Sequence, residues 1–213
     1  MKISEIFFSI QGEGVEIGLP TVFVRLFACD LRCTWCDSMY AVEGNDFREL
    51  SIEEVEREIE VYKCKRVCFT GGEPLIQKKE LIKLADSLIN KDYKILLETS
   101  GHKDPPQIFW TENCLISMDC KCPSSKMEGR MDFQLFERLR KKDQLKFVIK
   151  DEIDYTYAKK IINKFDINAS IIFQPVYGTN LGWLTEKVMQ DKLESVRVLP
   201  QLHKMIWGDI RGV

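Results

Sequence analysis

Residues 51–74 read SIEEVEREIEVYKCKRVCFTGGEP, and this stretch carries the clearest signal of the fold. Its first half predicts a helix with a capping box, because Ser51 is followed three residues later by Glu54. Apolar side chains recur along one face of that helix at Ile52, Val55, Ile59 and Tyr62. The second half predicts a buried strand, RVCFT, followed directly by the loop GGEP. Helix, strand and loop in this order form one unit of a parallel α/β sheet.

The same alternation runs through the rest of the chain. Short apolar runs predict strands at Thr21–Phe27, Arg66–Thr70, Lys94–Glu98, Leu115–Asp119, Leu145–Ile149, Ser170–Gln174 and Val196–Leu199. Helical periodicity predicts further helices at Lys79–Ile89, Phe133–Lys141, Tyr155–Phe165 and Thr185–Leu193. A closed eightfold barrel takes about 250 residues, and this chain has 213. We therefore expect an α/β fold with one domain, 1–213: an incomplete TIM-type βα barrel of six or seven parallel strands.

Composition and charge exclude several classes of protein. Lys and Arg number 31 against 33 Asp and Glu, a net charge of −2, which argues against a protein that tracks nucleic-acid phosphates. No run reaches the roughly 18 apolar residues that a membrane span needs, and the first residues lack the features of a signal peptide. We expect a cytoplasmic protein with no nucleic-acid or membrane partner. In that reducing setting, clustered cysteines bind metal or do chemistry.

Unusual segments follow the predicted strands at their carboxyl ends. They are CDLRCTWCD (29–37), GGEP (71–74), ETSG (98–101), DCKCPSS (119–125), Lys150-Asp151 and Gln174-Pro175. Active sites of parallel βα folds collect at this edge of the sheet. The sequence therefore predicts a site where these six segments meet.

The segment CDLRCTWCD holds three of the eight cysteines at the spacing C-x3-C-x2-C. A structural zinc ion takes four protein ligands, whereas a cubane cluster held by three cysteines leaves one iron open to another ligand. The residues alone leave two possibilities: a catalytic iron–sulfur cluster, or a zinc or iron–sulfur binding module without catalysis. Cys68 is interpreted as a packing residue and Cys64, on a short helix–strand connection, as incidental, and the role of Cys120 and Cys122 stays open.

Arg25 interrupts an apolar strand, on the same face as Phe23 and Phe27. A charge at such a position is costly unless it is paired. Its partner is either a substrate carboxylate or a carboxylate of the protein in a structural salt bridge.

The cysteine spacing after the first strand, with Trp35 before the last cysteine and GGEP after the second strand, resembles the radical S-adenosylmethionine enzymes. The motifs QGEG, WCDS, GGEP, ETSG, PSSKM and PQLHK, in this order, resemble one family of them, 7-carboxy-7-deazaguanine synthase. The resemblance implies a lyase of queuosine biosynthesis that converts 6-carboxy-5,6,7,8-tetrahydropterin to 7-carboxy-7-deazaguanine with loss of ammonia. It also implies a 4Fe–4S cluster, S-adenosylmethionine, Mg²⁺, a homodimer and an electron donor such as flavodoxin or ferredoxin. The nearest rival, an activase of a glycyl-radical enzyme, shares the cluster spacing but needs neither QGEG nor PSSKM.

The same resemblance assigns residues to ligands. The cluster would be held by Cys29, Cys33 and Cys36, and Mg²⁺ by Ser38. S-adenosylmethionine would contact Trp35, Cys36, Asp37, Gly71, Gly72, Glu73, Gly101, Asp119, Cys120, Lys121 and Gln174. The pterin would contact Ile10, Gln11, Gly12, Glu13, Arg25, Thr99, His203 and Val213, with Glu13 as an acceptor for the pterin amino group. No catalytic side chain is expected, because the chemistry is assigned to the radical that the cofactor generates. The Asp-Cys-Lys at 119–121 departs from the Ser-Pro-Lys common in the family.

Overall fold

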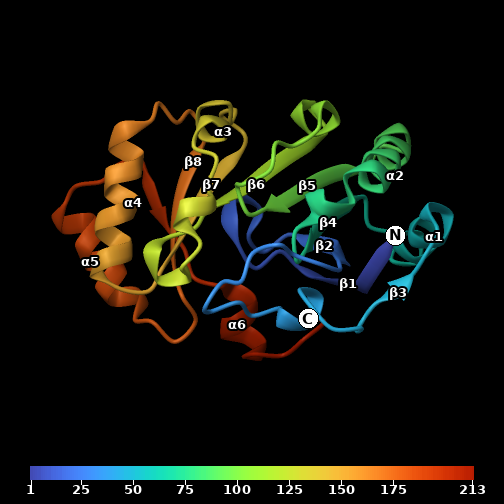
Figure 1. Ribbon diagram of the computed structural model, residues 1–213, viewed down its shortest axis with the longest axis horizontal. Helices are drawn as coiled ribbons and strands as arrows, with labels where there is room; N and C mark the ends of the chain where they lie inside the picture. The colour runs from blue at the N-terminus through green and yellow to red at the C-terminus, as the bar shows by residue number, and fades with distance from the viewer.

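The computed structural model describes residues 1–213, which build one nine-stranded sheet in the order β3-β1-β2-β4-β5-β6-β7-β8-β9 (Figure 1). The strands are β1 (Lys2–Ile10), β2 (Pro20–Leu26), β3 (Arg48–Glu49), β4 (Arg66–Gly71), β5 (Lys94–Thr99), β6 (Cys114–Cys120), β7 (Gln144–Ile149), β8 (Ser170–Pro175) and β9 (Val196–Val198). In the part of the sheet that runs β2-β4-β5-β6-β7-β8-β9, all neighbouring strands are parallel. Strand β1 pairs antiparallel with β2 and β3. The sheet ends at β3 and β9 without closing, which confirms an incomplete barrel with seven parallel strands.

Five helices cover the outer face of the curved sheet, and a sixth lies on the opposite side near the C-terminus (Figure 1). They are α1 (Ile52–Val61), α2 (Lys78–Asn90), α3 (Gln134–Glu137), α4 (Glu152–Lys164), α5 (Leu181–Gln190) and α6 (Leu202–Trp207). The predicted capping box is present, since Ser51 accepts from Glu54 N and the Glu54 carboxylate accepts from Ser51 N. None of these helices combines the length and apolarity of a membrane span.

Strand side chains divide between the two faces of the sheet with period two. Outward side chains such as Val24, Phe69 and Leu97 join the helices in the main apolar core. Alternate positions point to the concave face, and several of them are polar: Arg25, Thr70, Glu98, Asp119 and Lys146. The concave face of the sheet therefore carries the charged and polar side chains that could bind a ligand.

The structure differs from the predicted elements in four places. Strand β1 was not expected, because a β-bulge between Ile3 and Glu5 breaks its alternation. Helix α3 is shorter than the predicted Phe133–Lys141, because Arg140 N donates to the Asp143 carboxylate (2.8 Å) and the chain turns. Strand β3 was not predicted, because it is only two residues long. No helix was predicted between β5 and β6, and the structure has only a short 3₁₀ turn there, at Gln107–Trp110 after two prolines. Helix α6 was also not predicted.

Candidate active site

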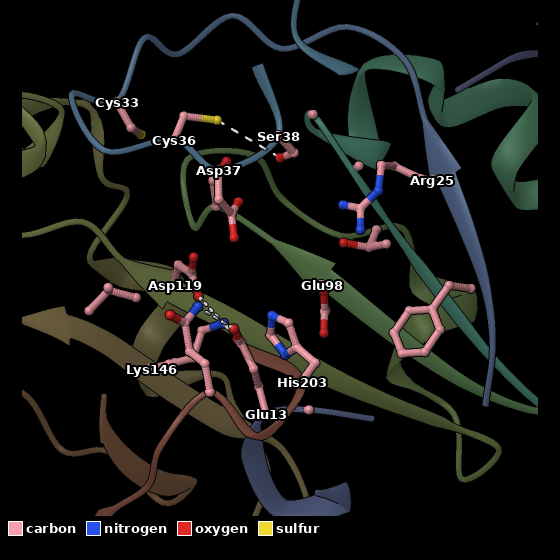
Figure 2. Close-up of a pocket in the computed structure, with 18 of the residues that line it drawn as sticks. Glu13, Arg25, Cys33, Cys36, Asp37, Ser38, Glu98, Asp119, Lys146 and His203 are labelled. Atoms are coloured by element: carbon pink, nitrogen blue, oxygen red, sulfur yellow. Dashed lines mark hydrogen bonds and ion pairs between the residues drawn. The ribbon is translucent and has the colours of Figure 1, made fainter. Parts of the chain in front are cut away.

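One cavity of about 230 Å³ opens at the concave face, at the carboxyl ends of the parallel strands (Figure 2). It brings together 18 of the residues singled out in the sequence: Ile10, Gln11, Gly12, Glu13, Arg25, Cys29, Cys33, Trp35, Cys36, Asp37, Ser38, Gly71, Gly72, Thr99, Asp119, Lys121, His203 and Val213. These residues come from both ends of the chain and from four parallel strands or the loops that follow them. Only the fold makes them neighbours.

Four predicted residues do not line the cavity: Glu73, Gly101, Cys120 and Gln174. The Cys120 side chain points into the apolar core, because its neighbour Asp119 takes the inward position on β6. Gln174 is fully buried, and neither its amide nitrogen nor its amide oxygen has a hydrogen-bond partner. The placement of these side chains gives no support to their assignment to S-adenosylmethionine.

Glu73 of GGEP has a structural task that explains its burial. Its carboxylate accepts hydrogen bonds from Leu75 N (3.0 Å), from Thr99 Oγ1 (2.8 Å) and from Ser100 N (2.8 Å). This buried carboxylate therefore ties the GGEP loop to the ETSG loop.

The glycines of GGEP are required by backbone packing. Gly71 has φ +136°, and a Cβ there would lie 2.1 Å from Leu26 O. A Cβ on Gly72 would lie 2.2 Å from Ala28 O, at the start of the cysteine loop. Only glycine fits two backbones this close, so this loop fixes the point at which the cysteine loop leaves β2.

The three thiols of Cys29, Cys33 and Cys36 face the same cavity. Burial raises the pKa of Cys29 to about 11 and also raises the pKa of Cys33, so thiolates at these positions need a positive partner such as iron. No three His, Cys, Asp or Glu side chains converge tightly enough to hold a single ion, so the structure contains no closed zinc site. Three spread thiolates fit the larger body of an iron–sulfur cluster.

The PSSKM segment holds the cysteine loop from one side. Trp35 Nε1 donates to Ser124 Oγ (3.0 Å), and the Ser124 hydroxyl donates in turn to the fully buried Asp154 carboxylate. Thr34 N donates to Ser125 O (3.2 Å). The motif PSSKM thus acts as a platform on which the cysteine loop rests.

A second anchor holds the other end of the loop. Asp30 Oδ1 lies 2.8 Å from His102 Nε2, and His102 Nδ1 lies 2.9 Å from Ser100 Oγ. Lys103 Nζ donates to the second Asp30 oxygen (2.9 Å). Burial would raise the pKa of Asp30, but hydrogen bonds from Lys103 and His102 lower it to about 2. Sequence reasoning passed over His102 because a lone histidine has no pattern that marks it.

A chain of buried charges crosses the cavity from Glu13 through Lys146 to Asp119 (Figure 2). Lys146 Nζ contacts Glu13 and lies 3.3 Å from Asp119 Oδ1, while Lys121 Nζ lies 2.6 Å from Asp119 Oδ2. Burial would lower the pKa of Lys146, but Asp119, Glu13 and Glu98 raise it well above its usual value. Burial would likewise raise the pKa of Glu13, yet Lys146 holds it well below its ordinary 4.5.

Arg25 has the protein partner that the sequence left as one of two possibilities. Its Nε lies 2.6 Å from Glu5 Oε1, and Glu5 also accepts from Tyr40 OH (2.7 Å) and from Arg211 Nε (3.0 Å). The guanidinium still lines the cavity, and its two terminal nitrogens donate to no acceptor of the chain. One edge of Arg25 is thus structural, and the other is available to a ligand.

The QGEG turn packs against the C-terminal segment. Leu202 N donates to Gly12 O (2.9 Å), and Gln201 Nε2 donates to Glu13 Oε1 (2.9 Å). A Cβ on Gly12 would lie 2.0 Å from His203 Nδ1, so the imidazole requires a glycine beneath it. This contact brings His203 and Val213 to the cavity.

Several cavity residues were given no role from the sequence, among them Phe7, Phe23, Glu98, Lys146, Tyr177 and Gln201. For Glu98 and Lys146 a signal existed. Each is a charged residue inside an apolar strand run, KILLET and QLKFVI, as Arg25 is in its own strand. That same pattern, applied to every strand, identifies both residues.

The incomplete barrel with a three-cysteine loop after its first parallel strand defines the class as radical S-adenosylmethionine enzymes, and the profile of the Radical SAM superfamily matches residues 24–109. A curated protein of Thermoplasma acidophilum named 7-carboxy-7-deazaguanine synthase is 38% identical over 213 residues, covering 100% of both chains. Proteins of the same name from Koribacter versatilis and Methanospirillum hungatei are 36% and 37% identical, covering 100% and 97% of this chain and 100% and 85% of theirs. The crystal structure of QueE from Escherichia coli, 23% identical, shares the fold with a TM-score of 0.78 over 95% of this chain and 94% of that one.

This chain belongs to the 7-carboxy-7-deazaguanine synthase family. It is a radical S-adenosylmethionine lyase with a 4Fe–4S cluster, as its superfamily implies. Neither the glycyl-radical activase nor the non-catalytic binding module is favoured by these relatives.

Proposed function

We propose that the cavity binds S-adenosylmethionine beside the cysteine loop and 6-carboxy-5,6,7,8-tetrahydropterin beside the QGEG turn, and that the chain converts this pterin to 7-carboxy-7-deazaguanine with loss of ammonia. The observation that carries the proposal is the single cavity shared by three cysteine thiols and by a wall with aromatic, cationic and amide groups. A radical made at the cluster would reach a ring bound against that wall without leaving the cavity. Water would be kept from it by the surrounding side chains.

The wall beside QGEG suits a flat polar ring with a carboxylate. Phe7 and Phe23 stack on each other with centroids 4.9 Å apart and provide an apolar surface. The unused edge of Arg25 would receive the substrate carboxylate in a charge-assisted pair. Gln11, Thr99 and His203 add hydrogen-bonding groups on the same cavity.

The cofactor side is built from the loops that follow β2, β4 and β6. Cys29, Cys33 and Cys36 would hold the cluster, and Asp37, Gly71, Gly72 and Asp119 would contact S-adenosylmethionine. When bound, the cluster and S-adenosylmethionine would together supply the 5′-deoxyadenosyl radical that takes hydrogen from the substrate. Lys121 holds Asp119 by an ion pair and lies 5.6 Å from the centre of the Trp35 ring, so the cofactor side is preformed.

Ser38 would bind Mg²⁺ together with the substrate and water. Its side chain is nearly buried, lines the cavity and makes no cap hydrogen bond; its hydroxyl contacts Cys36 Sγ at 3.9 Å. Mg²⁺ commonly takes one or two protein oxygens and completes its shell with water and substrate. A hydroxyl not used by the protein therefore suits this ion.

Ser38→Ala is expected to raise the Mg²⁺ concentration for half-maximal turnover by about tenfold or more, because loss of even an outer partner of a metal ligand typically costs 10- to 100-fold in metal affinity. Turnover measured against Mg²⁺ concentration checks this. Ser38→Thr, which keeps the hydroxyl, serves as the matched control and should behave like the unchanged protein. Equal Mg²⁺ dependence in all three proteins would count against Ser38 as the ligand.

The proposed reaction is tested by reconstituting the cluster without oxygen and adding S-adenosylmethionine, Mg²⁺, a strong reductant and the carboxytetrahydropterin. We expect 7-carboxy-7-deazaguanine and ammonia in equal amounts. If no deazaguanine forms, while a glycyl radical appears on a partner protein, the activase is the correct assignment.

The physiological state belongs to the same proposal. We infer a homodimer, reduced by a flavodoxin- or ferredoxin-type donor, and the strongly exposed apolar residues Met205, Ile206 and Ile210 near the C-terminus suit a protein contact. All eight cysteines are free thiols, which agrees with a cytoplasmic setting. The continuous sheet agrees with a single radical SAM domain over 1–213.

A further inference from the structure

The cavity contains one side-chain carboxylate that no cation of the chain pairs with. This residue is Glu98 on β5, which is half-buried and lines the cavity. The other cavity carboxylates have ion-pair partners: Glu13 with Lys146, Asp119 with Lys121 and Lys146, and Asp37 with Lys204. Figure 2 draws Glu98 apart from the contacts that join Glu13, Lys146 and Asp119. An unpaired carboxylate inside a cavity is costly to keep unless a ligand uses it.

Glu98 has two polar neighbours that hold it in place, the Gln11 amide and the Cys68 thiol. Gln11 Nε2 donates to Glu98 Oε1 (3.1 Å), and no N–H or hydroxyl of the chain donates to Glu98 Oε2. The orientation of the Gln11 amide is itself fixed, because its Oε1 accepts from Glu13 N (3.0 Å). Glu98 is thus aimed by the QGEG turn and keeps free acceptor capacity.

The strand register places Glu98 at the rim of an apolar floor. Phe23, Cys68 and Leu96 lie side by side on β2, β4 and β5 and form a small apolar cluster with Phe7. Glu98 follows Leu96 by two positions and therefore lies on the same face, one step nearer the carboxyl ends. Phe7 and Phe23 of this cluster line the cavity, so a flat ring bound against them would present an edge to Glu98.

One polar edge of a pterin carries two adjacent donors, the ring N3–H and the exocyclic 2-amino group. A carboxylate accepts two parallel N–H groups in a bidentate pair, as it does from arginine. We propose that Glu98 accepts these two donors and makes the cavity specific for a 2-amino-4-oxopyrimidine ring. This inference rests on the proposed pterin substrate. It moves the acceptor role away from Glu13, whose two oxygens already accept from Lys146 and Gln201.

Glu98→Gln tests the proposal because it replaces one acceptor oxygen with a donor of nearly the same shape. Reconstituted protein with S-adenosylmethionine is titrated calorimetrically with 6-carboxypterin and with 6-carboxylumazine, which has a carbonyl in place of the 2-amino group. The unchanged protein should prefer the pterin. In Glu98→Gln, affinity for the pterin should fall about tenfold to a hundredfold, while affinity for the lumazine stays equal or rises, because an amide N–H can donate to the new carbonyl.

Glu98→Asp keeps the charge on a shorter side chain and should bind the pterin more weakly but still prefer it. Glu13→Gln is the matched comparison, and it should weaken both ligands together. Preference for the pterin that survives Glu98→Gln and vanishes in Glu13→Gln would overturn the assignment to Glu98. If the unchanged protein binds neither ligand, the proposed substrate fails together with this inference. Circular dichroism and iron content of each variant verify folding and cluster loading.

Discussion

Cys33→Ala is expected to abolish turnover and to leave the chain unable to retain its iron–sulfur cluster. Cys33 supplies one of only three thiols that face the cavity, and no neighbouring His, Asp or Glu completes a metal site in its place. Loss of an outer partner of a metal ligand typically costs 10- to 100-fold, and loss of a ligand itself should exceed that range. Iron and sulfide analysis, with electron paramagnetic resonance before and after S-adenosylmethionine is added, measures the result.

Two other cysteines provide matched controls for this prediction. Cys64 lies half-buried outside the cavity, and Cys114 is buried in the apolar core. Cys64→Ala and Cys114→Ala should keep their iron and a spectrum that responds to S-adenosylmethionine. A Cys33→Ala protein with full iron and an unchanged spectrum would show that the three-cysteine loop does not hold the cluster.

Lys146→Met should lower the free energy of unfolding by about 3–5 kcal/mol, the usual cost of removing one partner of a buried ion pair, and should also abolish turnover. Lys146 is the shared partner of Glu13 and Asp119, and the methionine would leave Glu13 without an ion-pair partner and Asp119 with Lys121 alone. The loss of turnover follows because both the QGEG turn and the β6 loop are positioned through this amine. Urea unfolding without oxygen, followed by circular dichroism, measures the stability.

The loss of stability in Lys146→Met should depend on pH in a direction that can be checked. The pKa of Glu13 is lowered in the folded protein, so its stabilisation is present above its ordinary 4.5 and is lost as the pH falls toward the folded value. The deficit of Lys146→Met should therefore shrink below pH 4.5. Adding Glu13→Gln to Lys146→Met should recover part of the lost stability.

A surface lysine supplies the control for Lys146. Lys159 pairs with Asp191 (2.6 Å) where both side chains are about one-third exposed. Lys159→Met should change the free energy of unfolding by less than about 1 kcal/mol. If Lys146→Met has an equally small effect, the buried charge chain does not organise the cavity.

Local sequence patterns predicted the outline of the fold well. Seven strand runs became the seven parallel strands, and α1, α2, α4 and α5 form within a few residues of their predicted ranges. These patterns are reliable because apolar residues recur in the sequence at the period of the helix or strand that buries them. Strand β1 was not predicted, because a bulge at Ile3/Glu5 interrupts its periodicity. Helix α3 was predicted too long, because the Arg140–Asp143 contact ends it early.

The sequence by itself determined the barrel, the position of the cysteine loop after the first parallel strand, and most residues of the cavity, because these follow from spacing within short segments and from motifs in a fixed order. Tertiary structure alone decided which charged groups are already paired. One edge of Arg25 pairs with Glu5, and Glu13 pairs with Lys146, whereas Glu98 forms no ion pair with a cation of the chain. The physical reason is that a charge–charge interaction depends on distance and burial in three dimensions, and Glu13 and Lys146 are 133 positions apart in the chain.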